Sequence, residues 1–186
     1  MEIIRKIIFG FVALLATLVV ASFFVPDKFT VKRSIFINAP AEEIFKQVND
    51  LRNWNNWHQF HHLDEDWKLE YQFRHIGEGA GYVWSGKPET VGSGSLEIVS
   101  SNPNEEVIVN VHFDQKNQDV LSWYLFEKED RGTNVSFIMD FDVGLDPFEK
   151  LGGLKMKWKT NQSFDYGLDR LKEISEADSY TRQNQK

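Results

Sequence analysis

The chain has 186 residues, no cysteine, and 28 acidic against 21 basic residues, which gives a net charge of −7. This composition excludes disulfides and thiolate chemistry, and an acidic chain without a basic stripe repels phosphate backbones, so we expect no nucleic-acid partner. Aromatic residues make up 14% of the chain, which favours either a bulky core or the wall of a cavity.

Residues 7–25 form an uncharged and almost entirely apolar segment that follows two basic residues and ends at Pro26. At about 1.5 Å per residue, a helix of this length just reaches across the core of a bilayer. We therefore predict that residues 1–26 are a single-pass transmembrane anchor. A buried core helix and a signal peptide cleaved before Ser22 are the alternatives.

The charges that flank this segment bear on its orientation. Arg5 and Lys6 favour a cytoplasmic N-terminus, so we expect the following domain on the extracytoplasmic side. Lys28, Lys32 and Arg33 favour the opposite orientation, with the domain in the cytoplasm, and that alternative stays open.

The chain continues with one predicted strand and two short helices. Residues 29–38 alternate and are rich in β-formers, which is typical of a strand. A helix is predicted from Ala39 onward, because Pro40 is tolerated in a first turn and two glutamates complement a helix N-terminus. Aromatic residues spaced three apart within residues 51–60 indicate a second short helix.

From Lys68 onward the apolar residues recur at every second position, which indicates strands. Clusters of turn formers separate six such segments, and their short connections imply antiparallel hairpins. The predicted strands are residues 68–75, 81–85, 93–101, 106–114, 119–128 and 133–142.

A long amphipathic helix is predicted from Pro147 to about Ala177, followed by a polar tail at residues 178–186. Adjacent glycines at 152 and 153 weaken its first turns, so we expect a kink or a separate short turn there. Gly167 lies inside the apolar pattern, where glycine costs about 1 kcal/mol relative to alanine. We therefore expect Gly167 to permit close packing of this helix against the sheet.

Several short motifs follow one another along this pattern, at residues 31–35, 37–45, 53–57, 79–86, 92–96, 132–136 and 164–168. In this order they resemble the polyketide cyclase/START-like (SRPBCC) superfamily, over about residues 29–176. The resemblance implies an α+β helix-grip domain at residues 29–177, in which a curved antiparallel sheet of six to seven strands wraps around the long C-terminal helix. Members of the superfamily bind lipids, sterols, polyketides or hormones, and some are cyclases. The chain looks most like a membrane-tethered bacterial branch without a single established activity.

A helix-grip fold would place large side chains around the gap between sheet and helix, where they would bind an apolar ligand. The ligand-binding residues expected on this basis are Trp54, Trp57, Tyr82, Trp84, Trp123, Phe137, Met139 and Trp158. Ordinary core packing is the alternative for each of them. His112 lies between two apolar strand residues, and it would orient a polar ligand head if it points inward.

Other chemistry-bearing residues have simpler interpretations. The possible metal ligands cluster at His58, His61, His62, Asp64 and Asp66, but their spacing matches no zinc pattern, so we interpret the cluster as a solvated loop. We therefore expect neither a metal nor a cofactor.

The remaining catalytic patterns are also absent or weak in the sequence. The glycines of residues 77–81 precede a strand, and this context indicates a turn rather than a phosphate loop. No nucleophile elbow is present, and Asp140 and Asp142 alternate with apolar residues, so we expect them to face solvent.

Three functional hypotheses follow from the sequence. The leading one is a membrane-anchored binding protein for an apolar small molecule or lipid. The alternative is a cyclase- or dehydratase-type enzyme that acts on a bound polyketide-like substrate, and a third is an interaction domain without a ligand. The sequence leaves catalysis undecided and favours binding, because it shows no titratable group inside the expected pocket.

Overall fold

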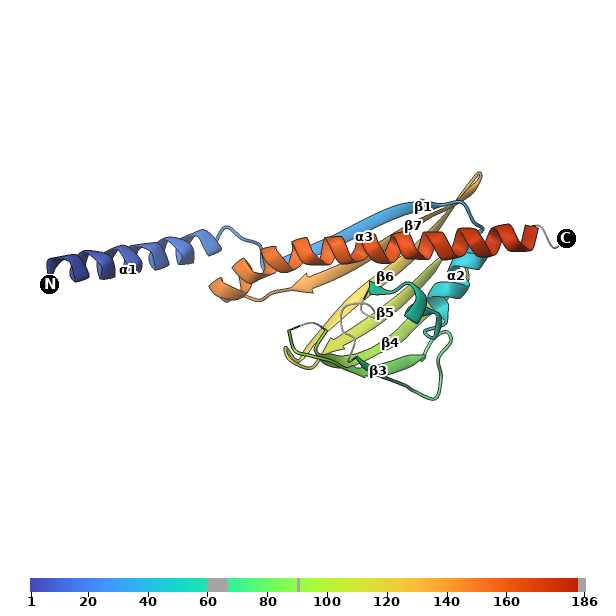
Figure 1. Cartoon of the computed structure of the whole chain (residues 1–186), viewed down its shortest axis with the longest axis horizontal. Helices are drawn as coiled ribbons and strands as arrows, with labels where there is room; N and C mark the ends of the chain where they lie inside the picture. The colour runs from blue at the N-terminus through green and yellow to red at the C-terminus, as the bar shows by residue number, and fades with distance from the viewer. Residues whose placement is uncertain (60–66, 90, 184–186) are drawn as a thin grey trace.

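Seven antiparallel strands form one sheet in the computed structural model. The structure describes residues 1–59, 67–89 and 91–183, apart from the side chains of residues 151, 154–156, 158, 159 and 183. The strand order is β1-β7-β6-β5-β4-β3-β2. The strands are β1 (Lys28–Ile37), β2 (Lys68–Tyr71), β3 (Gly81–Ser85), β4 (Ser93–Asn102), β5 (Glu106–Phe113), β6 (Gln118–Glu129) and β7 (Gly132–Asp142). The helices are α1 (Glu2–Ser22), α2 (Ala41–Asn49), the 3-10 helix η1 (Asn53–Asn56) and α3 (Pro147–Gln183). The predicted α+β architecture is confirmed (Figure 1).

The pairing of β1 with β7 joins the first and the last strand of the sheet. Their register runs from Lys28 opposite Asp142 to Ile37 opposite Thr133. Strands that are distant in the sequence therefore lie side by side, whereas the other strand pairs join consecutive strands. This arrangement places the residues that follow α1 beside the residues that lead into α3.

Turn-forming residues end most strands close to where the sequence predicts, except that β2 ends at Tyr71 rather than at His75. Asn104 and Asn117 adopt φ angles of 64° and 46°, and asparagine tolerates this left-handed conformation better than most residues. Glu129 pairs with Gly132, so only two residues connect β6 to β7. Such short connections force consecutive strands to be antiparallel.

Alternate residues of the central strands are buried and face α3. The inward residues of β5, β6 and β7 include Val107, Val109, Val111, Val120, Ser122, Tyr124, Phe126, Val135, Phe137, Met139 and Phe141. Figure 1 shows α3 lying along this face, and its residues Phe164, Leu168 and Leu171 are each at most 3% exposed. The sheet and α3 thus form two layers around one core.

Two helices differ from the predicted boundaries. The expected helix over residues 51–60 is reduced to the single turn η1, because the backbone leaves the helical conformation at Trp57 (φ −138°, ψ −28°), where Trp57 and His58 turn into the core. In contrast, α3 continues to Gln183, where a polar tail was expected. Ser179 is buried on this extension, and Arg182 forms an ion pair with Glu43 of α2.

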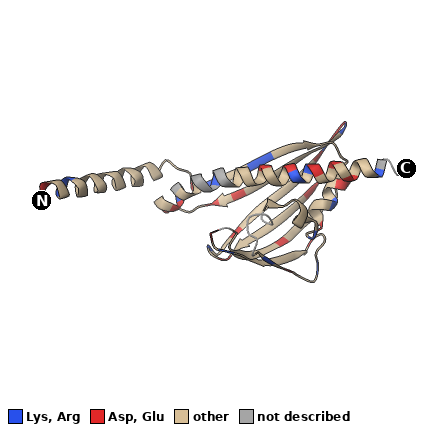
Figure 2. Ribbon diagram, in the orientation of Figure 1, with Lys and Arg blue, Asp and Glu red and all other residues tan. Residues whose placement is uncertain are grey.

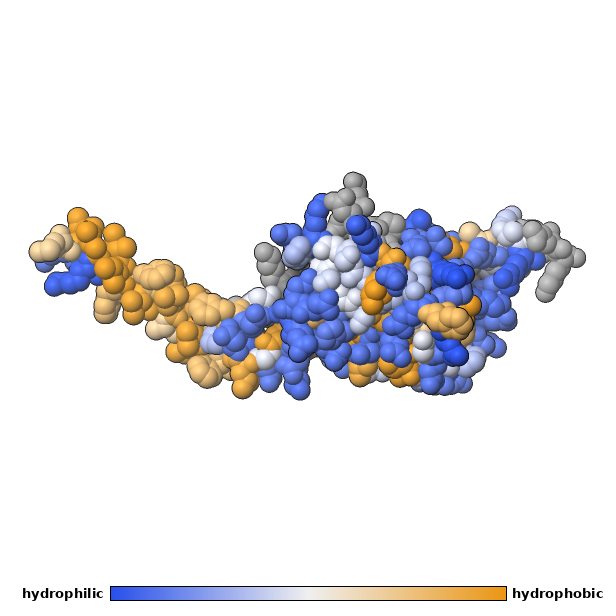
Figure 3. Space-filling model, turned by 90° about the horizontal axis from the view of Figure 1, so that it is seen from below, coloured by the Kyte–Doolittle hydropathy of each residue, from blue (hydrophilic) through white to orange (hydrophobic). Residues whose placement is uncertain are grey.

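α1 projects away from the sheet as a separate arm (Figure 1). Its large apolar side chains are exposed to an extent that would be costly in water, and Figure 3 shows the arm as mainly hydrophobic, with hydrophilic residues at its free end. At its C-terminal end Ser22 is buried, and the helix contacts α3. By length and composition, α1 is a candidate membrane span.

Two glycines let α3 approach its neighbours. A Cβ on Gly167 would lie 2.7 Å from Oε1 of Gln59, so the helix is closely packed there, but the expected neighbour was wrong, because Gly167 faces the segment after η1 and not the sheet. A Cβ on Gly153 would lie 2.9 Å from a methyl group of Val143. The helix is continuous through Gly152 and Gly153, so the expected separate turn does not form.

We predict that Gly167→Leu lowers the free energy of unfolding by about 1–3 kcal/mol through overpacking. Gly152→Ala is the control on the same helix, because no atom lies within 4 Å of its Cβ position. We expect this control to raise stability by up to about 1 kcal/mol. Urea denaturation of residues 27–186 measures both, and a wild-type midpoint for Gly167→Leu would contradict the close approach.

Candidate functional site

Three stacked aromatic rings join the sheet to α3. The ring centroid of Tyr124 on β6 lies 4.3 Å from that of Phe137 on β7, and Phe137 lies 3.9 Å from Phe164 on α3. All three side chains are at most 2% exposed. Such ring pairs contribute about 0.5–1.5 kcal/mol beyond the burial of their area, so this column fixes α3 above the centre of the sheet.

The segment after α2 adds further rings to the column. Trp54 and Trp57 approach Tyr124 edge-on, with centroids at 5.6 and 5.9 Å, and His58 stacks on Trp54 at 4.4 Å. His58 is only 2% exposed, so its expected place in a solvated loop is wrong. It is buried because its ring covers that of Trp54. The other members of the predicted cluster, His61, His62, Asp64 and Asp66, lie outside the described residues.

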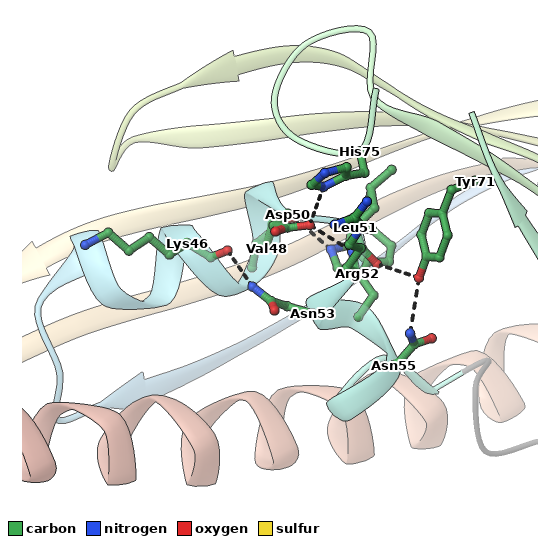
Figure 4. A network of polar contacts seen from close by, with 10 residues as sticks. Lys46, Val48, Asp50, Leu51, Arg52, Asn53, Asn55, Tyr71 and His75 are labelled. Carbon is green, nitrogen blue, oxygen red and sulfur yellow. Dashed lines mark hydrogen bonds and ion pairs between the residues drawn. The ribbon is translucent and has the colours of Figure 1, made fainter. Parts of the chain in front are cut away.

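A network of polar contacts holds the start of this segment in place (Figure 4). The carboxylate of Asp50 accepts a hydrogen bond from the backbone N–H of Arg52 at 3.0 Å, and it lies 3.1 Å from Nδ1 of His75. Asn55 on η1 donates its amide N–H to the hydroxyl of Tyr71 on β2 at 3.1 Å. The network ties η1 to β2 and to the loop before β3, so it sets the position of Trp54 on η1 and of Trp57 directly after it.

The two indole N–H groups of this segment are both used by α2. Trp54 donates to the carbonyl oxygen of Val48 at 2.8 Å, and Trp57 donates to that of Gln47 at 3.2 Å. These bonds satisfy the last carbonyls of the helix, which have no partner inside it. The two tryptophans therefore present their apolar ring faces and edges to the space beneath α3.

A small cavity lies between this aromatic cluster and the sheet. Its volume is about 10 Å³, which is room for about one water molecule. Ser122 on β6 is 2% exposed, and its hydroxyl has no hydrogen-bond partner in the described part of the chain. The lining residues are Trp54, His58, Leu96, Val109, Val111, Ser122, Tyr124, Phe137 and Met139. The wall is therefore mostly apolar, with a few polar groups.

Burial keeps two interior tyrosines protonated. Desolvation is the largest cause that raises the pKa of Tyr82 and of Tyr124, and the proximity of a second tyrosine raises each pKa further. Both hydroxyls stay neutral at physiological pH, so they donate and accept hydrogen bonds without carrying charge. No Asp, Glu, Lys or Arg side chain is buried in residues 1–59, 67–89 and 91–183, as far as these are described. The described interior thus offers neutral polar groups and one histidine.

The structure brings most of the predicted ligand-binding residues together beneath α3. Trp54, Phe137 and Met139 line the cavity, and Trp57 lies against Trp54 at 5.2 Å. The next three predicted residues lie elsewhere in the core or outside the described side chains. Tyr82 and Trp84 are buried on β3, 6.2 Å apart, and Trp158 on α3 has an undescribed side chain.

Two predicted residues face away from α3. Ser122 and Tyr124 point inward on β6, so Trp123 between them points to the outer face of the sheet. Its assignment to the gap is wrong, because that assignment followed side-chain size rather than strand alternation. His112 also lies on the outer face, where its Nδ1 is 3.0 Å from the carboxylate of Asp119. It therefore does not point toward a ligand inside the domain.

The sequence analysis missed six residues of the cavity wall, which are His58, Leu96, Val109, Val111, Ser122 and Tyr124. Ser122 and Tyr124 alternate with Val120 and Phe126, so the strand pattern alone would have placed both on the inner face. His58 has no comparable signal, because its burial depends on the tertiary position of Trp54. Strand alternation therefore predicts part of the cavity wall. The rest depends on contacts that form only in the folded chain.

The other chemistry-bearing patterns have structural roles in the described part of the chain. Asp140 and Asp142 are exposed, and the Asp142 carboxylate pairs with Lys28 at 3.3 Å. Gly77 and Gly79 adopt positive φ angles in the turn before β3. No group of three or more His, Asp or Glu side chains converges among the residues that were described.

A family model described as polyketide cyclase / dehydrase and lipid transport matches residues 28–176 of the chain. This match contains all seven strands, α2, η1 and most of α3. The comparison with curated proteins finds no match.

Solved structures share the fold at low sequence identity. A protein of unknown function from Staphylococcus aureus has a TM-score of 0.63 at 13% identity, with 82% of this chain and 96% of that chain covered. A protein from Chromobacterium violaceum has a TM-score of 0.56 at 13% identity, with coverages of 81% and 99%. DynU16, a protein in the dynemicin biosynthetic locus, has a TM-score of 0.55 at 14% identity, with coverages of 83% and 49%. At these identities the similarity shows the fold alone.

We predict that Phe164→Ala lowers the free energy of unfolding by about 3–5 kcal/mol, because it removes one ring of the column and leaves a hole beneath α3. Phe73→Ala is the matched control, since Phe73 is fully exposed, and we expect it to change stability by no more than about 0.5 kcal/mol. Urea denaturation of residues 27–186 compares the two variants. Equal losses would show that the column does not hold α3 on the sheet.

Proposed function

Because the chain belongs to the polyketide cyclase / dehydrase and lipid transport family, we propose that it is a membrane-anchored protein that binds an apolar small molecule or lipid between the sheet and α3. Residues 1–26 are the anchor in this proposal, and residues 29–177 are the binding domain. The ligand has an apolar body and one polar group. Its apolar body lies against Trp54, Phe137 and Met139, which border the cavity.

The observation that carries this proposal is the unpaired hydroxyl of Ser122. A buried hydroxyl without a partner costs about 1–3 kcal/mol, so such groups are uncommon in a finished core. Ser122 borders a cavity whose wall is otherwise largely hydrocarbon and aromatic. A ligand that offers one hydrogen-bonding atom there would satisfy the hydroxyl and bury its own apolar surface, and a single water would do so in the absence of ligand.

A ligand larger than water has to move side chains in this part of the interior, because the cavity holds only about 10 Å³. Met139 borders it, and methionine adapts its shape to an incoming group more easily than a branched or aromatic side chain. Leu96, Val109 and Val111 line the sheet side, where the backbone ladder keeps them in place. Met139 lies on β7 of the same sheet, so we expect the ligand to enlarge the cavity through a rearrangement of the Met139 side chain.

The alternative activity is a cyclase- or dehydratase-type reaction on a bound polyketide-like substrate. His58 is the observation in its favour, since it is buried at the cavity and an imidazole is able to act as an acid or a base. Against it, the described interior holds no carboxylate, and its tyrosines remain protonated. Binding is therefore the function that the described site supports best.

The proposed anchor predicts where the full chain is found in cells. We expect it in the membrane fraction after washes with high salt and with carbonate, because α1 exposes its apolar side chains along its whole length. Residues 27–186 alone should be soluble, since the family match begins at residue 28. Release of the full chain by carbonate, or a mature N-terminus at Ser22, would contradict the anchor.

The proposed pocket predicts saturable binding by residues 27–186. A panel of fatty acids, sterols and aromatic polyketides should contain ligands that change tryptophan emission, because the rings of Trp54 and Trp57 lie at the site. For such a ligand, Ser122→Ala should weaken affinity roughly two- to tenfold, the equivalent of one hydrogen bond. Titration followed by tryptophan fluorescence measures the dissociation constants.

Ser136→Ala is the control for this experiment. Ser136 is also a buried serine of the central sheet, but it points to the opposite face, where its hydroxyl lies 2.7 Å from that of Ser34. We expect its removal to leave ligand affinity unchanged. No saturable binding across the panel would overturn the binding function, whereas equal effects of the two serine variants would overturn the role of Ser122 alone.

A further inference from the structure

The connection from β7 to α3 exposes two large apolar side chains close to the end of α1. Leu145 is 80% exposed and Phe148 is 64% exposed, and Phe23 and Phe24 beyond α1 are exposed to a similar degree. Isolated exposed apolar residues are common on protein surfaces, but four of them at one end of a domain form a patch. Phe23 and Phe24 belong to the proposed anchor, and Leu145 and Phe148 belong to the segment beside it.

Hydrogen bonds place the connection at the level where α1 ends. The backbone N–H of Val143 donates to the carbonyl oxygen of Asp27 at 2.8 Å, and Asp27 lies two residues beyond the apolar segment that ends at Val25. α3 contacts α1, and Figure 1 shows the start of α3 and the β7–α3 connection reaching as far toward the anchor as its last turn. Leu145 lies two residues after Val143, a distance of at most about 7 Å along the chain.

The two apolar side chains are held outward by an ordered turn. The Asp146 carboxylate caps α3, because it accepts hydrogen bonds from the backbone N–H groups of Phe148 at 2.8 Å and Glu149 at 3.1 Å. The carboxylate of Asp142 accepts another from the backbone of Gly144 at 2.9 Å, which is the main cause that lowers the pKa of Asp142. The exposure of Leu145 and Phe148 is thus built into the turn.

Two of the acidic side chains around this turn have cationic partners nearby. Asp142 pairs with Lys28 at 3.3 Å, and Glu149 pairs with Lys116 at 2.6 Å. Figure 2 shows that α1 carries charged residues at its N-terminal end and none along the rest of its length. The two paired carboxylates therefore add little net repulsion toward lipid headgroups. The most exposed side chains of the turn are apolar.

From this geometry we propose that Leu145 and Phe148 enter the interfacial region of the same bilayer that holds α1. They form a second membrane contact, which rests on the proposed anchor and fixes the orientation of the domain on the membrane. The interfacial layer is roughly 5–10 Å deep, which matches the reach of the turn beyond the end of the apolar segment. With this contact the N-terminal end of α3 faces the lipid, so a ligand that partitions into the bilayer meets the domain at that end.

The absence of cysteine allows a direct test on the full chain in phosphatidylcholine vesicles. Single cysteines at Leu145→Cys and Phe148→Cys carry an environment-sensitive nitrobenzoxadiazole dye, and phospholipids with nitroxide groups on the acyl chains serve as quenchers. We expect blue-shifted emission and strong quenching at both positions. Phe73→Cys is the matched control, because Phe73 is an exposed aromatic residue that follows the end of β2 distant from α1, and it should stay unquenched.

Leu14→Cys in the middle of α1 separates the second contact from the anchor. Quenching at Leu14, Leu145 and Phe148 but not at Phe73 supports the proposal. Quenching at Leu14 alone, with the other three positions alike, overturns the second contact and leaves the anchor in place. The absence of quenching at Leu14 overturns the anchor, and the second contact with it.

Discussion

The stack of Tyr124, Phe137 and Phe164 is the contact on which the rest of the domain depends. The sheet has one apolar face, and α3 is the element that covers its centre, so the two layers have to be held at a fixed separation. A ring on β6, a ring on β7 and a ring on α3 set that separation, with centroids 4.3 and 3.9 Å apart. The tryptophans from η1 and His58 then fill the space beside the column. What remains is the small cavity at Ser122.

Strand alternation explains both what the sequence predicts well and what it predicts poorly. The seven strands and their antiparallel pairing follow from apolar residues at every second position and from asparagine and glycine in the turns. The same rule places Ser122 and Tyr124 on the inner face of the sheet and Trp123 on the outer face. The prediction for Trp123 was wrong because it followed the size of the side chain instead of this rule. The burial of His58 and the single turn of η1 depend on contacts between segments that are distant in the sequence. Local sequence patterns do not predict such contacts.

The polar groups of the described interior support the proposed binding function more than catalysis. Its polar groups are hydroxyls, an amide at Gln59 and the imidazole of His58, and no buried carboxylate or ammonium group accompanies them in the described residues. Neutral groups select a ligand by shape and by one or two hydrogen bonds, whereas catalysis of a cyclisation needs a group that gains or loses a proton. The family contains both kinds of protein, so the difference lies in these few side chains and not in the fold.

The pairing of β1 with β7 has a consequence for the order in which the chain folds during synthesis. β1 is the first strand to leave the ribosome, yet its partner begins at Gly132, about a hundred residues later. At 5–20 residues per second, β1 waits roughly 5–20 s with its backbone donors and acceptors unpaired. Lys28, Lys32 and Arg33 lie along it, and charges of this kind hinder unpaired strands from joining other chains. The strand that follows α1 therefore carries charges that help to keep it unpaired until β7 has been synthesised.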